Sequence, residues 1–402
     1  MDSRSKPFTS ASKDLPIRPE PSTPARNPRP LGLRDFSFLL RSEIYHPLTT
    51  IDSLPAFRSR LASASLTPSI PIPELLKNGQ FRLAAIAATN RITSSPPPTP
   101  AELFDLFYIR LASLTLLDAT DIAAAESIAL GDVTSVAYVN PETGENLLPW
   151  SLRLIAIRLQ SLSNAEPRRA LTGYYDLATE AREIYSKISA DDADGRLMWK
   201  ARLRDLGIRV ANCLVEMGDW DGAKRHLEGL RVGLGEGLDG REEDDMLRGR
   251  IALVLLRIGD LEGARHYLTE PNDADDAEDG AVHLSATSYA EALRPLLSLA
   301  HGNYSSATAQ FRGGLIPDAL ARQNRAICAV YTGRLNEGKD LLQSLIDDNI
   351  TSRTVIFNLS TAFELLSDRA RNMKLQLAET IAARDGALTG WEIAPARFKL
   401  SN

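Results

Sequence analysis

From Leu31 onward, apolar residues recur along the chain mostly at intervals of three and four positions. One clear stripe consists of Leu247, Ile251, Leu255 and Ile258. This spacing predicts helices that bury one face, because positions three and four apart lie on the same side of an α-helix. Strand-like alternation occurs at 132–138, where it runs into the turn sequence NPETG. We therefore expect a loop or small hairpin there and an all-α fold elsewhere.

Helical patterns flank a central region of the chain on both sides. Four patterns precede this region and one pair follows it. Their bounds are read from the first and last periodic apolar residues and from nearby capping residues. The predicted helices are Phe81–Ile92, Ala101–Leu116, Leu148–Leu162, Ala170–Ile188, Thr354–Leu366 and Asp368–Ala382.

The central region contains a repeated motif. MGDWDGAKRHLEGL at 217–230 is followed by IGDLEGARHYL at 258–268. In each, the glycine ends one helical pattern, the acid can cap the next, and a small residue five positions after the glycine permits close helix packing. The motif predicts the elbow and packing contact of a helical hairpin. The residues assigned to elbows, including two weaker copies, are Gly218, Asp219, Trp220, Ala223, Gly259, Asp260, Ala264, Gly302, Tyr304, Ala307 and Gly333.

The intervals between the elbow glycines bracket the period of about 34 residues that is typical of tetratricopeptide repeats. Small residues also occur seven positions before three of these glycines, at Ala211, Ala252 and Ala326. Pro295 occupies the corresponding position before Gly302 and is expected to kink or shorten its helix. The pattern therefore predicts an α-solenoid of tetratricopeptide-like helical hairpins.

The chain divides into four parts by composition and pattern. We expect a disordered Pro/Ser-rich tail at 1–31, because its prolines prevent a regular helix and it has little apolar surface to bury. An N-terminal helical region at 32–165 would contain an irregular loop near 131–147. The repeat array would cover 166–385, and a C-terminal tail 386–402.

Two stretches inside the array are expected to be solvated loops. The stretch 233–245 begins with closely spaced glycines, and 270–280 carries six acids and no base between Glu270 and Asp279. Limited proteolysis is expected to cut first in the acidic stretch and in the N-terminal tail.

Composition and charge argue against several kinds of partner. The 402 residues are 44% hydrophobic and 24% charged, with a formal net charge of -6, which gives no reason to expect nucleic-acid binding. The longest apolar runs are too short to cross a bilayer, so we expect no direct membrane insertion. Two cysteines, Cys213 and Cys328, fit a reducing compartment such as the cytoplasm.

No motif in the sequence predicts catalysis. The spelling GxGxxG at 235–240 follows a helical pattern and precedes four acids, so it lacks the context of a phosphate-binding loop. The five histidines form no metal-ligand pair, and His226 and His266 are expected to point outward from second helices. The two cysteines are expected to pack as hydrophobes. We predict no catalytic, cofactor or metal site, and a protein that is not an enzyme.

Several segments resemble the subunit 12 family of the trafficking protein particle (TRAPP) complex. The resemblance extends, with gaps, from about Leu39 to the C-terminus, and the 233–245 and 270–280 stretches depart from it. The segments that carry it are Tyr45–Leu48, Leu148–Arg153, Met198–Leu203, Ala211–Leu214 and Val355–Ala382.

The resemblance implies a non-catalytic scaffold subunit of the TRAPP tethering and Rab-exchange complex in vesicle-mediated transport. It implies roles in ER–Golgi traffic and autophagy, and a cytoplasmic protein peripherally associated with Golgi, ER–Golgi intermediate and autophagic membranes. The implied partners are other large TRAPP subunits, such as subunit eleven, and through them a Rab GTPase.

A second hypothesis is a tetratricopeptide adaptor for a chaperone or another multiprotein assembly. A groove that clamps a terminal carboxylate would need a lysine four residues before an asparagine on a first helix. Asn212 could be that asparagine, but Ile208 stands where the lysine is needed.

The last helical pair carries a candidate partner interface. On a helix starting at Val355, the apolar stripe faces the preceding hairpin, whereas Phe357 falls on the opposite face. Either the tail with Trp391 and Phe398 folds back over Phe357, or these three aromatic residues meet a partner.

Overall fold

The computed structural model describes ten stretches of the chain. They are residues 35–48, 54–58, 70–140, 143–163, 166–232, 238–269, 289–313, 316–384, 392 and 395–400. The predicted tail at 1–31, the acidic stretch 270–280 and Trp391 lie outside the described residues. In the described part, helices follow one another without a regular strand, so the prediction of an all-α solenoid is confirmed.

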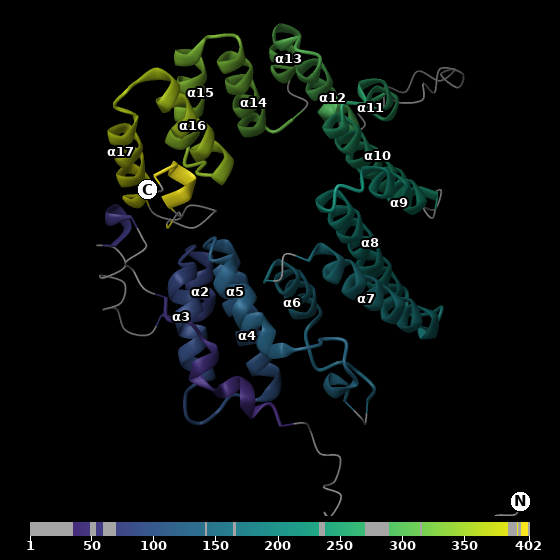
Figure 1. The fold of residues 1–402 in the computed structure, drawn as a ribbon. Helices are drawn as coiled ribbons and strands as arrows, with labels where there is room; N and C mark the ends of the chain where they lie inside the picture. The colour runs from purple at the N-terminus through teal and green to yellow at the C-terminus, as the bar shows by residue number, and fades with distance from the viewer. Residues whose placement is uncertain are drawn as a thin grey trace, which may run out of the picture.

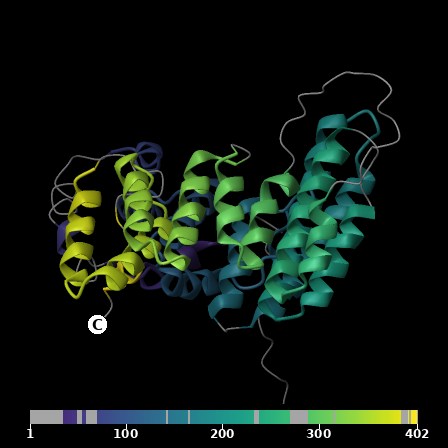
Figure 2. The same ribbon diagram turned by 90° about the horizontal axis from the view of Figure 1, so that it is seen from above.

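The helices pack mainly against their neighbours in sequence. Their course bends into a ring, in which α16 and α17 return to the vicinity of α2–α5 (Figure 1). Seen from above, the helices of the C-terminal half stand side by side in a row (Figure 2). The α-helices are α2 (Ile72–Lys77), α3 (Phe81–Ile92), α4 (Pro100–Leu116), α5 (Thr120–Ser127), α6 (Trp150–Ser163), α7 (Pro167–Lys187), α8 (Ala193–Glu216), α9 (Trp220–Val232), α10 (Leu238–Ile258), α11 (Leu261–Leu268), α12 (Tyr289–Ala300), α13 (Tyr304–Phe311), α14 (Asp318–Tyr331), α15 (Leu335–Asp347), α16 (Arg353–Leu366) and α17 (Ala370–Ala382).

The N-terminal region holds the largest hydrophobic core, which extends from Phe36 to Cys213. This core is continuous from α6 into α7 and α8. The predicted boundary near residue 165 therefore does not separate two hydrophobic cores. The region with strand-like alternation contains the 3-10 helix η4 (Val136–Tyr138) and one isolated bridge between Val139 and Asn146.

The hairpin elbows have the geometry that the repeated motif requires. Gly218 and Gly259 have φ values of 76° and 91°, a left-handed conformation in which a side chain would be strained. Asp219 accepts a hydrogen bond from the amide of Gly222 at 2.9 Å, and Asp260 accepts one from Gly263 at 2.9 Å. Each acid therefore caps the second helix of its hairpin.

The weaker elbows follow the same plan. Gly302 and Gly333 also have positive φ values, and Asn303 caps α13 in place of an aspartate. Tyr304, the first residue of α13, stacks on Tyr331 at the end of α14 with ring centroids 5.4 Å apart. Pro295 lies inside α12, which continues through it to Ala300.

The small residues of the elbows lie in tightly packed positions. Ala223, Ala264 and Ala307 are completely buried. Replacing Ala223 or Ala264 by leucine should overpack the contact between paired helices and lower the free energy of unfolding by about 1 to 3 kcal/mol. Denaturant unfolding followed by circular dichroism would measure this. Arg225→Leu, at an exposed position of α9, serves as the control and should change stability by less than about 0.5 kcal/mol.

The stretch 233–245 was predicted to be a loop, and this is wrong from residue 238 onward. Leu238 begins α10, and the acids that follow stabilise its first turns. Glu243 forms an ion pair with Arg204 of α8, and Asp244 accepts a hydrogen bond from Arg231 of α9 at 2.6 Å. These partners come from other helices, so the sequence pattern of the acids did not indicate them.

The ring is closed by ion pairs between its two ends. Asp118, which follows α4, accepts hydrogen bonds from Arg397 at 2.7 and 2.8 Å and pairs with Arg353 of α16. Arg82 of α3 donates to Glu392 at 2.8 Å. The first helices of the chain are thereby joined to its last residues.

The C-terminal residues fold back onto the last hairpin. Phe398 in η5 (Pro395–Phe398) has no exposed surface and lies in the core formed with α14–α17, which also contains Phe57. Phe398 is therefore not available to a partner, which corrects that part of the candidate interface. Phe357 remains 44% exposed, although the Lys399 ammonium lies 5.0 Å from its ring centroid.

Candidate partner-binding groove

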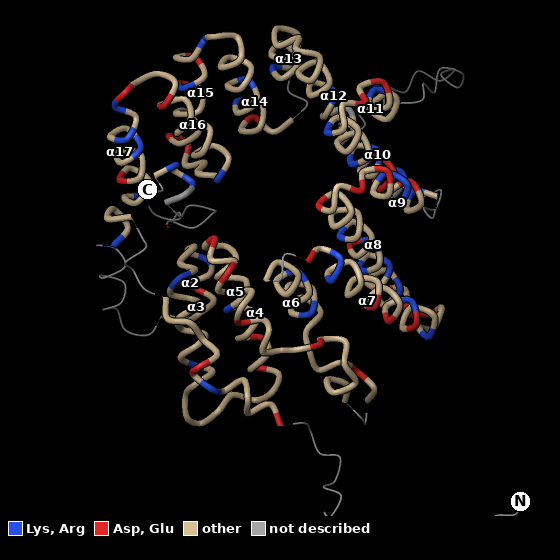
Figure 3. Tube along the Cα trace, in the orientation of Figure 1, with Lys and Arg blue, Asp and Glu red and all other residues tan. Residues whose placement is uncertain are grey.

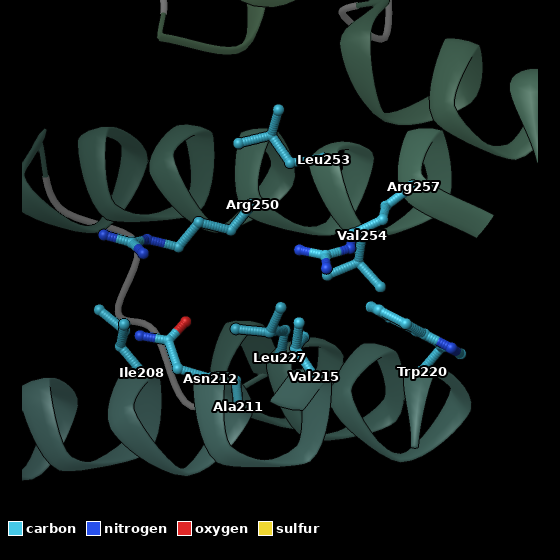
Figure 4. A pocket seen from close by; sticks show the side chains of 10 residues that line it. All are labelled: Ile208, Ala211, Asn212, Val215, Trp220, Leu227, Arg250, Leu253, Val254 and Arg257. Atoms are coloured by element: carbon cyan, nitrogen blue, oxygen red, sulfur yellow. The ribbon is translucent and has the colours of Figure 1, made fainter. Parts of the chain in front are cut away.

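A groove opens between the first helices of two consecutive hairpins, with α8 on one side, α10 on the other and α9 at its base. It encloses a cavity of about 180 Å³. The residues that line it are Ile208, Ala211, Asn212, Val215, Trp220, Leu227, Arg250, Leu253, Val254 and Arg257, all labelled in Figure 4. We call this surface the α8–α10 groove.

The floor of the groove is apolar. Ala211, Leu227 and Val254 belong to one hydrophobic cluster, against which Val215 and Trp220 pack. Each of these residues follows the helical spacing that the sequence predicts for a buried face, so the floor is an extension of the core that remains open at the top. Such a floor can hold an apolar side chain.

Two arginines project into the groove from α10. Arg257 lies over the indole of Trp220, with its Cζ atom 5.1 Å from the ring centroid. Arg250 extends toward Ile208 and Asn212 (Figure 4), and its Nε is buried without a hydrogen-bond acceptor. None of the residues lining the groove is acidic. The groove therefore presents two cations whose charge is not neutralised by its own lining.

Arg250 supplies the positive charge beside Asn212 that the sequence pattern of α8 lacks. Ile208 lacks the positive charge that a carboxylate clamp with Asn212 would need. Arg250 brings a guanidinium to the same neighbourhood from the next first helix (Figure 4). The cation and the amide are thus supplied by α10 and α8, the first helices of two consecutive hairpins, with α9 between them in the sequence.

Sequence reasoning missed Arg250 and Arg257, although a signal was present. The positions three and four residues away from Arg250 on either side are all apolar, so it has no acid within pairing distance on its own helix. Acidic and basic residues are interspersed along α7–α10 (Figure 3). Arg250 is thus distinguished by the lack of an acidic residue near it on α10, and not by lying on a helix face that is basic throughout.

A second cavity of about 240 Å³ lies between α7, α8, α9 and α10. Some of its polar groups are paired within the chain: Glu243 forms an ion pair with Arg204, and His226 makes a hydrogen bond of 3.0 Å with the carbonyl of Gly207. The Oε2 atom of Glu243 is buried without a hydrogen-bond partner. His226 therefore points toward α8, so the prediction that it points outward is wrong. Burial lowers the pKa of its imidazole. We interpret this cavity as part of the packing between hairpins.

Two segments that carry the resemblance to the TRAPP family meet in space. The indoles of Trp150 on α6 and Trp199 on α8 have centroids 5.5 Å apart. The Arg202 guanidinium lies 5.0 Å from the Trp150 centroid and 4.4 Å from that of Trp199. The contact joins the N-terminal region to the first helix of the repeated-motif hairpins.

The part of the chain that the structure describes offers no reactive thiol or metal site. Cys213 and Cys328 are free and buried there, and burial raises the pKa of both thiols. The described residues contain no group of three or more His, Cys, Asp or Glu side chains placed to hold a metal ion. No described helix is long and apolar enough to span a membrane.

The fold is typical of one class of protein, the α-solenoids. The extended surface of an α-solenoid serves mainly to bind other proteins. No family model matches the chain.

Two curated proteins are similar to this chain in sequence. Trafficking protein particle complex subunit 12 of Mus musculus is 26% identical over 320 residues, which cover 72% of this chain and 39% of the relative. The Homo sapiens protein of the same name is 26% identical over 309 residues, covering 70% of this chain and 40% of the relative. The chain thus spans about two fifths of the length of the relatives it matches.

Proposed function

We propose that this chain is a non-catalytic scaffold subunit of a TRAPP complex, in which it contributes to vesicle-mediated transport. The observation that carries the proposal is the similarity to subunit 12 of that complex in two mammals over more than two thirds of this chain. The all-α solenoid supports it, because an extended solenoid offers large surfaces to neighbouring subunits.

The finer parts of the proposal follow from the resemblance. The chain would bind other large TRAPP subunits, such as subunit eleven, and through them act with a Rab GTPase. It would work in ER–Golgi transport and autophagy, as a cytoplasmic protein peripherally associated with Golgi, ER–Golgi intermediate and autophagic membranes. The 166–385 region would act as a tetratricopeptide-like array, with the elbow residues holding its hairpins in register.

The test is purification of the tagged full chain from its own cells, followed by native mass spectrometry. Co-purification of TRAPP subunits in fixed stoichiometry is the expected result. Recovery of a chaperone or of a different assembly, without TRAPP subunits, would favour the adaptor hypothesis, which the placement of Arg250 beside Asn212 supports.

Among the described residues of the candidate interface, Phe357 is the one that stays exposed at the C-terminal end of the solenoid. Phe357→Asp should leave the fold intact, since the side chain is 44% exposed and the new carboxylate would face the Lys399 ammonium. The variant should lose co-purifying TRAPP subunits. Leu365→Asp, at a 54% exposed position of the same helix, is the matched control and should retain them. Equal recovery with both variants would remove Phe357 from the interface.

A further inference from the structure

We propose that the α8–α10 groove binds an internal, extended segment of a partner protein. The segment carries two side-chain carboxylates about 9 to 10 Å apart with an apolar side chain between them. This inference deepens the proposed function, since it names the chemistry of a partner that the scaffold holds.

The charge of the groove requires an anionic ligand. Arg250 and Arg257 enter the groove from one helix, and the lining contains no acid to neutralise them. The buried Nε of Arg250 has no acceptor. A buried donor without a partner costs free energy, and a ligand carboxylate would neutralise the guanidinium that carries this donor.

The spacing of the two cations sets the spacing of the ligand's acids. Arg250 and Arg257 are seven positions apart on α10, which places their Cα atoms about 10 Å apart along the helix axis. In a polyproline II segment, residues i and i+3 lie on the same side and about 9 Å apart. Acids at these two positions of an extended segment would therefore reach one arginine each.

The floor between the arginines selects the residue between the acids. Val215, Leu227 and Val254 form an apolar surface midway along the groove (Figure 4). A leucine of the ligand would remove this surface from water, while Asn212 donates its side-chain amide to the carboxylate at the Arg250 end. The groove is thus suited to four consecutive ligand residues in the order acidic, apolar, any residue, acidic.

A single terminal carboxylate does not fit this arrangement as well. It would neutralise one guanidinium and leave the other, two helical turns away, without a counter-charge. The stacking of Arg257 on Trp220 holds its guanidinium at the far end of the groove, 5.1 Å from the indole centroid, so both cations are held apart. An internal segment with two acids is the ligand that satisfies both.

The inference is tested with the purified full chain and labelled synthetic peptides. The probe is a fluorescein-labelled peptide, acetylated and amidated, with the core Glu-Leu-Pro-Glu; its anisotropy reports binding. Matched peptides replace both glutamates by glutamine, replace the leucine by serine, or carry one glutamate and a free C-terminus. Arg250→Glu and Arg257→Glu are compared with Arg225→Glu, an exposed arginine of α9 outside the groove.

The two-acid peptide should bind with a dissociation constant below about 1 mM, more weakly at high salt. The glutamine peptide, Arg250→Glu and Arg257→Glu should each weaken binding about tenfold or more, and the serine peptide should weaken it by a smaller factor. Arg225→Glu should bind as the parent chain does, and circular dichroism should show that all variants are folded.

Several results would overturn the inference. One is that the two-acid peptide does not bind the parent chain, and another is that the glutamine peptide binds as tightly as the two-acid peptide. The others are that Arg225→Glu weakens binding as much as Arg250→Glu and Arg257→Glu do, or that the peptide with the free C-terminus binds more tightly than the two-acid peptide. The failure of this inference can be distinguished from the failure of the TRAPP proposal. Peptide binding without co-purifying TRAPP subunits would contradict only the proposed function, and the reverse would contradict only the groove's ligand.

Discussion

Replacing Glu126 by alanine is expected to lower the free energy of unfolding of the N-terminal helices by about 3 to 5 kcal/mol. Its carboxylate is fully buried and accepts hydrogen bonds from Arg110 at 2.7 and 2.9 Å and from the amide of His46 at 2.8 Å. The Arg110 side chain is only 2% exposed. Without Glu126, the Arg110 guanidinium would be buried without a counter-charge, which is far more costly than the loss of an exposed ion pair.

The comparison with an exposed pair makes this prediction specific. Arg158 on α6 and Glu216 on α8 also form a two-point ion pair, but their side chains are 34% and 39% exposed. Glu216→Ala should therefore cost at most about 1 kcal/mol. Denaturant unfolding, with hydrogen exchange to localise the loss to α4 and α5, would measure both. Equal effects of Glu126→Ala and Glu216→Ala would mean that burial of the first pair does not matter.

The buried pair also shows how a segment of the TRAPP resemblance is held. The His46 carbonyl accepts a hydrogen bond from Arg110 at 2.8 Å, while its amide donates to Glu126. Neighbouring Tyr45 donates its hydroxyl to the Leu39 carbonyl at 2.7 Å. Burial raises the pKa of Tyr45, and the Glu126 carboxylate adds to the shift. The 45–48 segment is thus fixed onto α4 and α5 by backbone groups as well as side chains.

The helices and their elbows could be predicted from the sequence because their signals are local. The apolar spacing gave Phe81–Ile92 with the same bounds as α3, and the Gly–Asp pairs marked the turns at 218 and 259. The short helices α2 and α5 were missed, since each has too few residues to show a period.

The closure of the ring could not be predicted in the same way. Asp118 meets Arg397 from the other end of the chain, and neither has a distinctive neighbour in sequence. The groove posed the same difficulty, because Arg250 and Asn212 come from different hairpins and their approach depends on how these stack. Local patterns define hairpins, whereas the curvature that brings their surfaces together depends on all the contacts between them.

Removing the side chain of Phe398 is expected to release the C-terminal residues from the last hairpin. Phe398 is fully buried in the core that contains Ile356, Leu359 and Phe363, so Phe398→Ala should cost about 3 to 5 kcal/mol through lost burial and the cavity left behind. Hydrogen exchange should then show reduced protection in α16 and α17, measured against α8 and α9, which contribute no residue to this core.

Phe357→Ala provides the control for Phe398→Ala, because it removes the same side chain from the same part of the solenoid at a 44% exposed position. It should leave the protection of α16 nearly unchanged. Protection in α16 and α17 that survives Phe398→Ala would mean that the tail contributes little to their stability. Loss in Phe398→Ala alone would mean that the last hairpin is stabilised by the chain's own C-terminal residues, whereas the Phe357 ring on the same hairpin stays exposed to a partner.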